Sequence, residues 1–311
     1  MLDVRRLRVL KEVAVQGSFS AAAESLDYTQ SAVSQQIAAL EREAGARLLE
    51  RHPRGVRLTD AGRALVAHTE VILSRLADAE AELDAIAGLR GGRLRLVAFP
   101  TAGASILPEA IARFRAEAPG VELSLEPREP DEGLACLHAG ECDIAVTIRA
   151  PHRGTPDDGT MRRHLVDDAM CVCLPAGHRL ATAPTLRLAD LSDEAWLVGS
   201  TGRCPDTAVL LHACQSAGFE PRIGFHSDDY LAMQGFVAAG VGVALIPELA
   251  LVTVRDDVVI RELAGENHHR VIEAATLDGA YCSPATQLML DLLADVSDAF
   301  PRRGGGLALA S

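Results

Sequence analysis

The sequence has no apolar run of the roughly 18 residues that a membrane helix requires, and it has few aromatic residues. Aromatic side chains make up 4% of the chain, whereas hydrophobic residues reach 48% and charged residues 23%. This composition excludes wholesale disorder and predicts aliphatic cores. The basic N-terminus is not followed by the apolar region of a secretory signal. We therefore expect a cytoplasmic protein of two or three domains whose seven cysteines stay reduced.

Charge is distributed unevenly along the 311 residues, whose net charge is −13. Residues 1–66 carry ten basic against eight acidic residues, residues 67–90 carry two against five, and residues 91–311 carry eighteen against thirty. A small basic module joined to an acidic body is expected to meet a polyanion through the module alone.

The first 59 residues predict three short helices followed by a hairpin. Apolar spacing indicates a helix over residues 3–15, a second one ending near Leu26, and a third from Thr29 to Gly45. A turn at residues 52–55 then joins two short apolar stretches. This order of elements is the outline of a winged helix-turn-helix domain, which we assign to residues 1–59.

The third predicted helix presents short polar side chains opposite its apolar stripe. Glutamine can pair with adenine, serine permits close approach to base edges, and the helix N-terminus can hold a phosphate. Arginines of the wing can contact the DNA backbone or a minor groove. A polar face exposed to solvent is the plain alternative, but the combination with the wing favours binding to double-stranded DNA. The candidate DNA-binding residues are Ser18, Thr29, Gln30, Ser31, Ser34, Gln35, Arg51, Arg54 and Arg57.

Residues 60–90 predict a long linker helix and a glycine-rich hinge. Apolar or small residues recur at heptad spacing and form the seam Leu65, Thr69, Ile72, Leu76, Ala79, Leu83 and Ile86. One interpretation is a helix that packs on its own domain. The length and the heptad spacing favour a dimerising coiled coil, and two modules on one dimer imply an interrupted, dyad-symmetric DNA site.

Residues 91–300 alternate between strand and helix patterns, which predicts an α/β domain. We expect a mostly parallel sheet covered on both faces, with enough chain for two such sheets. Predicted strands include Met170–Leu174 and Val271–Thr276, and a final helix is predicted over 284–299. The tail, residues 301–311, is predicted to be disordered.

The run over residues 16–65 resembles the LysR family of bacterial transcriptional regulators. The matching motifs are Phe19-Ser20, Ala22-Ala23, Gln30-Ser31, Ser34, Leu40-Glu41, Gly45–Leu49, Arg51, Thr59-Asp60 and Gly62. Four later segments, Leu94–Pro100 with Thr101, 140–145, 174–180 and Met233–Pro247, resemble the effector-binding domain of that family.

The resemblance implies a two-lobed domain like a type 2 periplasmic binding protein, with an effector in the cleft between the lobes. Lobe I would comprise residues 91–165 and 268–300, and lobe II residues 166–267. It also implies a transcriptional regulator that forms a dimer or a dimer of dimers, with RNA polymerase as a further candidate partner.

The same resemblance implies five effector-binding residues, Thr101, Ala102, Arg149, Ser200 and Thr201. The hydroxyl residues follow strand ends, where helix amides can hold an anion, and Arg149 can pair with a carboxylate. These features favour a small anionic effector. Ordinary helix capping is the simpler explanation for each hydroxyl residue taken alone.

Other functions have less support in the sequence. Cys204 and Cys214 suggest a thiol-based redox sensor of the same family as an alternative. A solute-binding protein would leave residues 1–90 unexplained. We find no nucleophile elbow, phosphate-binding loop or dinucleotide motif, and no metal-ligand spacing, so we expect no enzyme, no cofactor and no metal.

Overall fold

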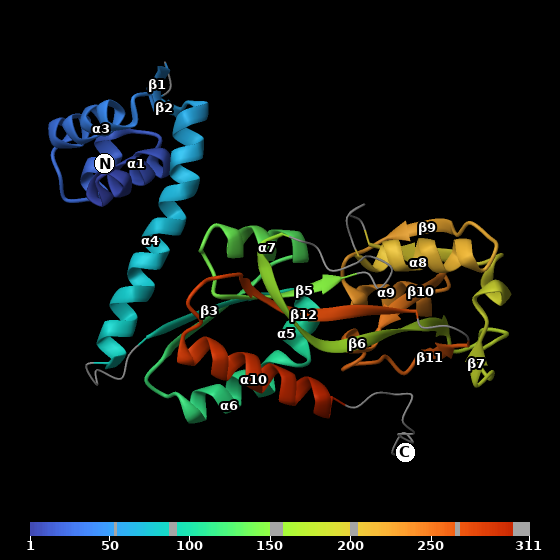
Figure 1. The fold of residues 1–311 in the computed structure, drawn as a ribbon. Helices are drawn as coiled ribbons and strands as arrows, with labels where there is room; N and C mark the ends of the chain where they lie inside the picture. The colour runs from blue at the N-terminus through green and yellow to red at the C-terminus, as the bar shows by residue number, and fades with distance from the viewer. Residues whose placement is uncertain (53–54, 87–91, 150–157, 200–204, 265–267, 301–311) are drawn as a thin grey trace. The chain divides into compact units, whose positions relative to one another are not determined.

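The computed structural model describes residues 1–52, 55–86, 92–149, 158–199, 205–264 and 268–300 (Figure 1). The chain divides into two compact units. The first contains Met1–Arg95 together with Gly120–Glu122 and Ala135–Asp143, and the second contains the remaining residues. In the described part of the chain, the structure has no helix that combines the length and the apolar character needed to span a membrane.

The N-terminal module of the first unit is the predicted winged helix-turn-helix. Its elements are α1 (Val4–Gln16), α2 (Phe19–Ser25), α3 (Gln30–Ala44), β1 (Leu49–His52) and β2 (Gly55–Leu58). Apolar residues of all three helices and of the start of the hairpin form one buried cluster. The predicted ends of α3 are confirmed, because Thr29 caps its N-terminus and Gly45 adopts the left-handed conformation at its C-terminus.

The linker helix α4 (Asp60–Ile86) starts on this module and extends beyond it (Figure 1). Leu65 packs against the module core and Thr69 is fully buried, whereas Ile72, Leu76 and Leu83 are 39%, 42% and 67% exposed. The first turns of the helix therefore pack on their own domain. Ile72, Leu76 and Leu83 of the heptad seam are exposed, and their pairing with a second helix stays a prediction.

Close backbone approach anchors the beginning of α4. A Cβ atom at Gly62 would lie 2.1 Å from the carbonyl oxygen of Leu48, so only glycine fits there. The Thr59 hydroxyl donates to the Arg47 carbonyl at 2.7 Å and accepts from the Gly62 amide at 3.0 Å. These contacts tie the first turn of the linker helix to the residues that precede the wing.

A second contact of α4 centres on Arg95. Its guanidinium donates to Ser74 at 3.0 Å, to the carbonyl of Gly140 at 2.8 Å and to Asp143 at 2.7 Å. Gly140 also lies so close to Ser74 that a Cβ atom at position 140 would be 3.0 Å from the serine Cβ. The linker helix is therefore fixed at two places within the first unit: at its first turn, and at Ser74 near its middle.

The second unit is built on a ten-stranded sheet whose main order is β4-β3-β5-β12-β6-β10-β8-β9. In addition, β11 pairs with β6, and β7 pairs with β11. The strands are β3 (Arg93–Ala98), β4 (Glu122–Pro127), β5 (Ile144–Arg149), β6 (Thr160–Pro175), β7 (Thr185–Leu186), β8 (Ala195–Val198), β9 (Arg222–His226), β10 (Val243–Pro247), β11 (Val258–Leu263) and β12 (His269–Leu277).

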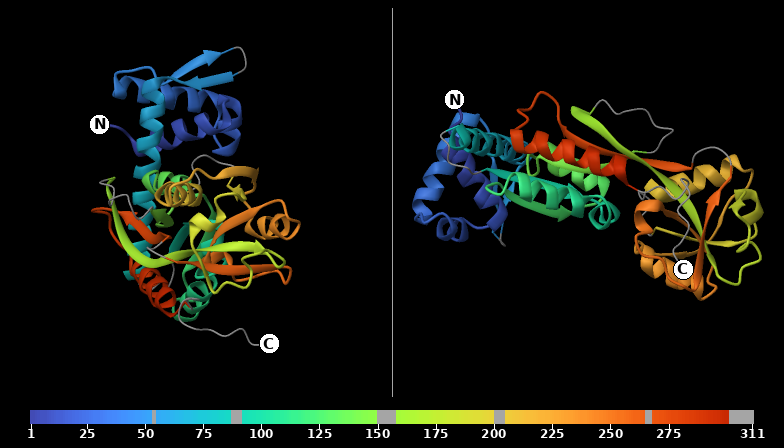
Figure 2. Two further views of the ribbon diagram at one scale, coloured as in Figure 1. Left: turned by 90° about the vertical axis from the view of Figure 1, so that its right-hand side faces the viewer. Right: turned by 90° about the horizontal axis from the view of Figure 1, so that it is seen from below.

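The prediction of a mostly parallel sheet is wrong, because β6 runs antiparallel to β12, β10 and β11, and β12 runs antiparallel to β5. The chain was expected to be long enough for two sheets, and β6 connects the strands around β5 with those around β10. The first part of β6 pairs with β12 and its last residues pair with β10 and β11. The strands β6 and β12 lie side by side over much of their length (Figures 1 and 2).

Helices cover the sheet. They are α5 (Pro100–Ala104), α6 (Leu107–Glu117), α7 (Pro130–His138), α8 (Pro205–Ser216), α9 (Tyr230–Ala238) and α10 (Pro284–Ala299), with 3-10 turns at Leu188–Leu191 and Glu248–Ala250. Successive side chains at the end of β6 point to opposite faces of the sheet and pack in two different hydrophobic clusters. Val172 packs in the cluster that includes α8, whereas Cys171 and Cys173 pack in the cluster that includes α9. The expectation of helices on both faces is confirmed there.

Candidate functional site

Helix α3 presents a polar face built on a buried apolar one. Val33, Ile37 and Leu40 are at most 3% exposed and fix the orientation of the helix on the module. The predicted contact residues lie on the opposite side and are exposed: Thr29, Gln30, Ser31, Ser34 and Gln35. This arrangement leaves the first two turns of α3 accessible to a nucleic acid groove.

The N-terminus of α3 is organised by hydroxyl groups. Thr29 Oγ1 accepts a hydrogen bond from the Ala32 amide at 3.2 Å and lies 3.0 Å from Ser31 Oγ. Ser18 has a different place, because it is half-buried and caps α2 by accepting from the Ala21 amide at 3.4 Å. Ser18 therefore has a structural role, and its contact with DNA stays a prediction.

The wing is fixed to the turn between α1 and α2. The Val56 amide donates to the carbonyl of Gly17 at 3.0 Å. Of the three predicted wing arginines, Arg57 is exposed on β2. Arg51 lies in β1 opposite Val56, but its side chain is outside the described part, and Arg54 lies outside the described residues.

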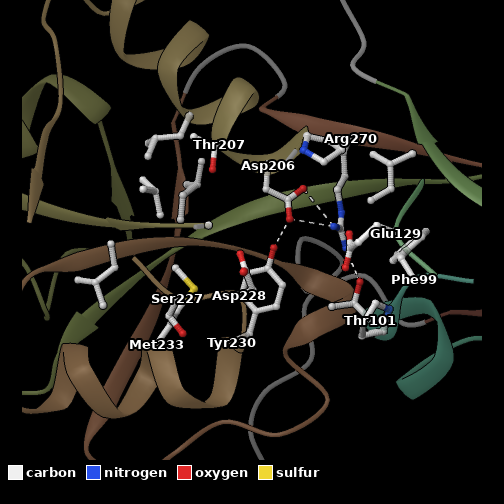
Figure 3. Close-up of a pocket in the computed structure, with 18 residues that line it drawn as sticks. Phe99, Thr101, Glu129, Asp206, Thr207, Ser227, Asp228, Tyr230, Met233 and Arg270 are labelled. Carbon is white, nitrogen blue, oxygen red and sulfur yellow. Dashed lines mark hydrogen bonds and ion pairs between the residues drawn. The ribbon is translucent and has the colours of Figure 1, made fainter. Parts of the chain in front are cut away.

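The second unit contains a cavity of about 150 Å³ (Figure 3). It is lined on one side by residues that follow β3 and β4 and by Ile148 of β5, and on the other by residues of β8, α8, α9 and β10. Phe99, Ile148, Leu197, Met233 and Leu245 supply apolar walls. An apolar cavity with a few polar groups, placed where strand ends meet helices, is typical of a small-molecule site.

Arg270 is the buried centre of the polar side of this cavity. Its guanidinium donates to Asp168 at 2.8 Å, to Asp206 at 3.0 and 3.1 Å and to the Thr101 hydroxyl at 2.7 Å, and lies 5.2 Å from the centre of the Phe99 ring. Burial lowers the pKa of Arg270, but Asp206 and Asp168 outweigh burial and raise it above its ordinary value. The guanidinium therefore stays charged.

Among the residues predicted to bind an effector, Thr101 does line the cavity. It is 9% exposed, and its hydroxyl holds Arg270. Ala102 is buried and is not among the lining residues. Ser200 and Thr201 lie outside the described residues.

The interpretation of Arg149 as a partner for a ligand carboxylate is not supported by its position. Arg149 is not among the lining residues, and its Nε donates to Glu273 of the neighbouring strand β12 at 2.9 Å. The reason is that β5 pairs with β12, and Glu273 of β12 supplies the carboxylate.

The sequence interpretation missed several polar lining residues, namely Glu129, Asp206, Ser227, Asp228, Tyr230 and Arg270. Tyr230 donates to Asp206, and Arg270 pairs with the same carboxylate. The sequence gives no signal that Arg270 is buried and paired, because this residue follows two histidines and directly precedes the predicted strand Val271–Thr276. The acidic residues lie in loops or at helix starts and have no such signal.

The predicted thiol pair can be described only in part. Cys204 lies outside the described residues. Cys214 is fully buried, and burial raises the pKa of its thiol to about 12. At neutral pH Cys214 therefore carries its proton and is a poor nucleophile. Within the described ranges, no group of three or more His, Cys, Asp or Glu residues is arranged to hold a metal ion.

Two family models match the chain, one at its N-terminus and one over most of the remainder. Residues 4–63 match the family model "Bacterial regulatory helix-turn-helix protein, lysR family", and residues 87–298 match "LysR substrate binding domain". The chain is 32% identical over 292 residues to "Probable HTH-type transcriptional regulator LrrA" of Synechococcus elongatus, covering 94% of this chain and 96% of that one.

Solved structures share the fold. CbnR, crystallised at full length with its target DNA, is 23% identical, with a TM-score of 0.70 over 95% of this chain and 100% of that one. Full-length OxyR of Pseudomonas aeruginosa is 22% identical, with a TM-score of 0.72 over 96% of this chain and 95% of that one.

Proposed function

Since the chain belongs to the LysR family of bacterial transcriptional regulators, we propose that it binds DNA through α3 and the wing and responds to a small molecule in the cavity around Arg270. The observation that carries the DNA-binding part is the exposed polar face of α3, held in place by a buried apolar one. We infer a regulatory and non-catalytic role because the similar proteins are named as transcriptional regulators.

The two parts of the proposed interface have different tasks. Gln30, Ser31, Ser34 and Gln35 occupy the first two turns of α3, where side chains can reach base edges in a major groove. Thr29, the α3 amides and the wing arginines are suited to phosphates or a minor groove. Base contacts set sequence preference, whereas phosphate contacts set affinity and its dependence on salt.

We further propose a dimer that binds an interrupted dyad-symmetric site, with a dimer of dimers as the larger assembly. The exposed seam residues Ile72, Leu76 and Leu83 of α4 support the dimer, because apolar side chains at heptad spacing pair with a second helix. Effector binding would shift the arrangement of the subunits and so the spacing or bending of the bound DNA. RNA polymerase in the cytoplasm would be the partner whose binding depends on this change in the DNA.

A thiol-based sensor is the second candidate, and the likeness of fold to OxyR is compatible with it. The burial and the raised pKa of Cys214 speak against this candidate. An effector-responsive regulator is the function that the described geometry supports better.

The test is a footprint of the purified protein on DNA upstream of its own gene and of an adjacent divergent gene. We expect a protected site with dyad symmetry. Gln35→Ala should remove sequence preference at one position of each half-site, at about 1–3 kcal/mol per lost base contact. Arg57→Ala should weaken binding to all sequences and reduce the salt dependence. Unchanged binding in both variants would refute the proposed interface.

A further inference from the structure

The last turn of α3 carries an arginine on the same face as the residues proposed to contact bases. Arg42 follows Ser31 by eleven residues, which is about three turns at roughly 3.6 residues per turn, so the two side chains point the same way. Val33, Ile37 and Leu40 form the opposite, buried face. Arg42 is exposed and therefore continues the polar face of α3 toward its C-terminus.

The two glutamates that flank Arg42 are bound to other groups. The Glu41 carboxylate accepts hydrogen bonds from the amides of the first residue of β1 and of the residue before it, at 3.3 and 2.8 Å. The Glu43 carboxylate pairs with Arg6 of α1. Among the described residues, the Arg42 side chain has no ion pair or hydrogen bond, and the wing residues outside the described ranges, 53–54, are not acidic. The charge of Arg42 therefore remains for a negatively charged partner.

The length of α3 determines which part of a DNA duplex Arg42 can reach. Eleven residues at about 1.5 Å per residue separate Ser31 and Arg42 by about 16 Å along the helix axis. The major groove is about 12 Å wide, and recognition helices contact base edges with their N-terminal residues. The last turn of such a helix lies at the border of the groove, beside the phosphates. A guanidinium fits the oxygens of a phosphate with two parallel hydrogen bonds.

We propose that Arg42 binds a DNA phosphate outside the base pairs that the first two turns of α3 contact. The two ends of α3 then contact phosphates on either side of the major groove, the N-terminus through Thr29 and its amides and the last turn through Arg42. This inference rests on the proposed function, because it extends the DNA interface of α3. Phosphate contacts carry no sequence information, so Arg42 sets affinity and orientation rather than sequence preference.

The experiment maps phosphate contacts by ethylation interference on the site that the footprint identifies, with the full-length natural protein and with Arg42→Gln. We expect one phosphate in each half-site to lose its interference in the variant, while the preferred bases stay the same. At constant salt the affinity should fall about tenfold, equally for sequences with altered bases. The slope of log affinity against log salt should become shallower by about 1 for each Arg42 in contact, or about 2 for a dimer.

Arg115→Gln is the matched control, because Arg115 is also an exposed arginine in the last turn of a helix, α6 of the second unit. This variant loses the same charge and should bind DNA as the natural protein does. Arg42→Lys keeps the charge and should keep the salt dependence. Urea denaturation of Arg42→Gln tests the plain alternative that Arg42 only stabilises the C-terminus of α3. That role would lower stability and leave every phosphate contact in place.

Three results would overturn the proposal: an affinity and salt dependence of Arg42→Gln equal to those of the natural protein, an unchanged set of interfering phosphates, or a loss confined to one base position. The last result would place Arg42 at a base edge. Each of them leaves the proposed function intact, since the natural protein still protects its site. A natural protein without any sequence-specific footprint would instead refute the proposed function, and the role of Arg42 with it.

Discussion

At the scale of single residues, Arg270 is the centre of a cluster of buried charges beside the cavity. It contacts Asp168, Asp206 and Thr101, and the Tyr230 hydroxyl donates to the same Asp206. A buried ion pair adds little stability compared with apolar residues of the same shape, but removal of one partner leaves an uncompensated charge. The role of Arg270 is therefore to hold two carboxylates in fixed positions beside the cavity.

Arg270→Met is expected to lower the free energy of unfolding by about 3–5 kcal/mol, because Asp168 and Asp206 would be left buried without a counter-ion. Chemical denaturation measures this loss. The triple variant Arg270→Met/Asp168→Asn/Asp206→Asn should recover much of it. If the single variant were as stable as the natural protein, the buried pairs would not be present as described.

The pKa of Glu129 predicts how the stability of the protein depends on pH. Burial and the charges of Asp228, Asp206 and Glu132, only partly offset by Arg270, raise this pKa, so Glu129 takes up a proton at a higher pH than an ordinary glutamate. The stability that protonated Glu129 contributes is present at low pH and should be lost as the pH rises through the raised pKa. Urea denaturation at several pH values measures the effect, and Glu129→Gln should lose this part of the dependence.

At the scale of elements, the sequence pattern predicts a helix or strand well when its charged side chains are exposed to solvent rather than paired with other elements. The pattern of apolar positions gave α3 and α10 with bounds close to the observed ones, since both helices have one buried face and clear caps. The strand β6 was predicted only over Met170–Leu174, although it begins at Thr160. Its first residues carry charges that pair with other elements, such as Arg162 with Glu273, and such pairing has no sequence signal.

Gly62→Ala tests the junction between the wing and α4. Alanine favours a helix, but its Cβ would lie 2.1 Å from the Leu48 carbonyl oxygen, so the junction has to shift. We expect a loss of about 1–3 kcal/mol in the free energy of unfolding, measured by thermal or urea denaturation. Ala61→Ser at the exposed neighbouring position should stay within about 0.5 kcal/mol. Equal stability of both variants would contradict the described contact.

At the scale of the whole molecule, the division into a DNA-binding module, a linker helix and an α/β domain follows from sequence alone, because each part has its own periodicity. The cavity could be predicted only in outline. Thr101 follows a strand and could be placed, whereas Glu129, Asp228 and Arg270 meet only after residues far apart in the chain have folded together. Such a set of contacts depends on the sheet order, which placed β12 beside β5.

Self-association through α4 is tested with the double variant Ile72→Glu/Leu76→Glu. Both side chains are exposed on the heptad seam, and charges there would repel a second copy of the helix. We expect a monomer in light scattering after gel filtration and weaker binding to a dyad-symmetric site. His68→Glu, also exposed on α4, is the control and should leave the dimer intact. A dimer that persists in the double variant would place the interface elsewhere.

The central position of β12 also affects the order in which the protein can be completed during synthesis. A ribosome releases β12 and α10 after the other strands and helices, yet β12 lies between β5 and β6. The later half of the sheet, around β8 and β10, can assemble before the earlier half, which must wait for its central strand. Until then β5 has an unpaired edge, a known starting point for aggregation. A chain that ends before His269 would therefore lack a strand at the middle of its sheet, and we expect it to be degraded rather than to accumulate as a shorter regulator.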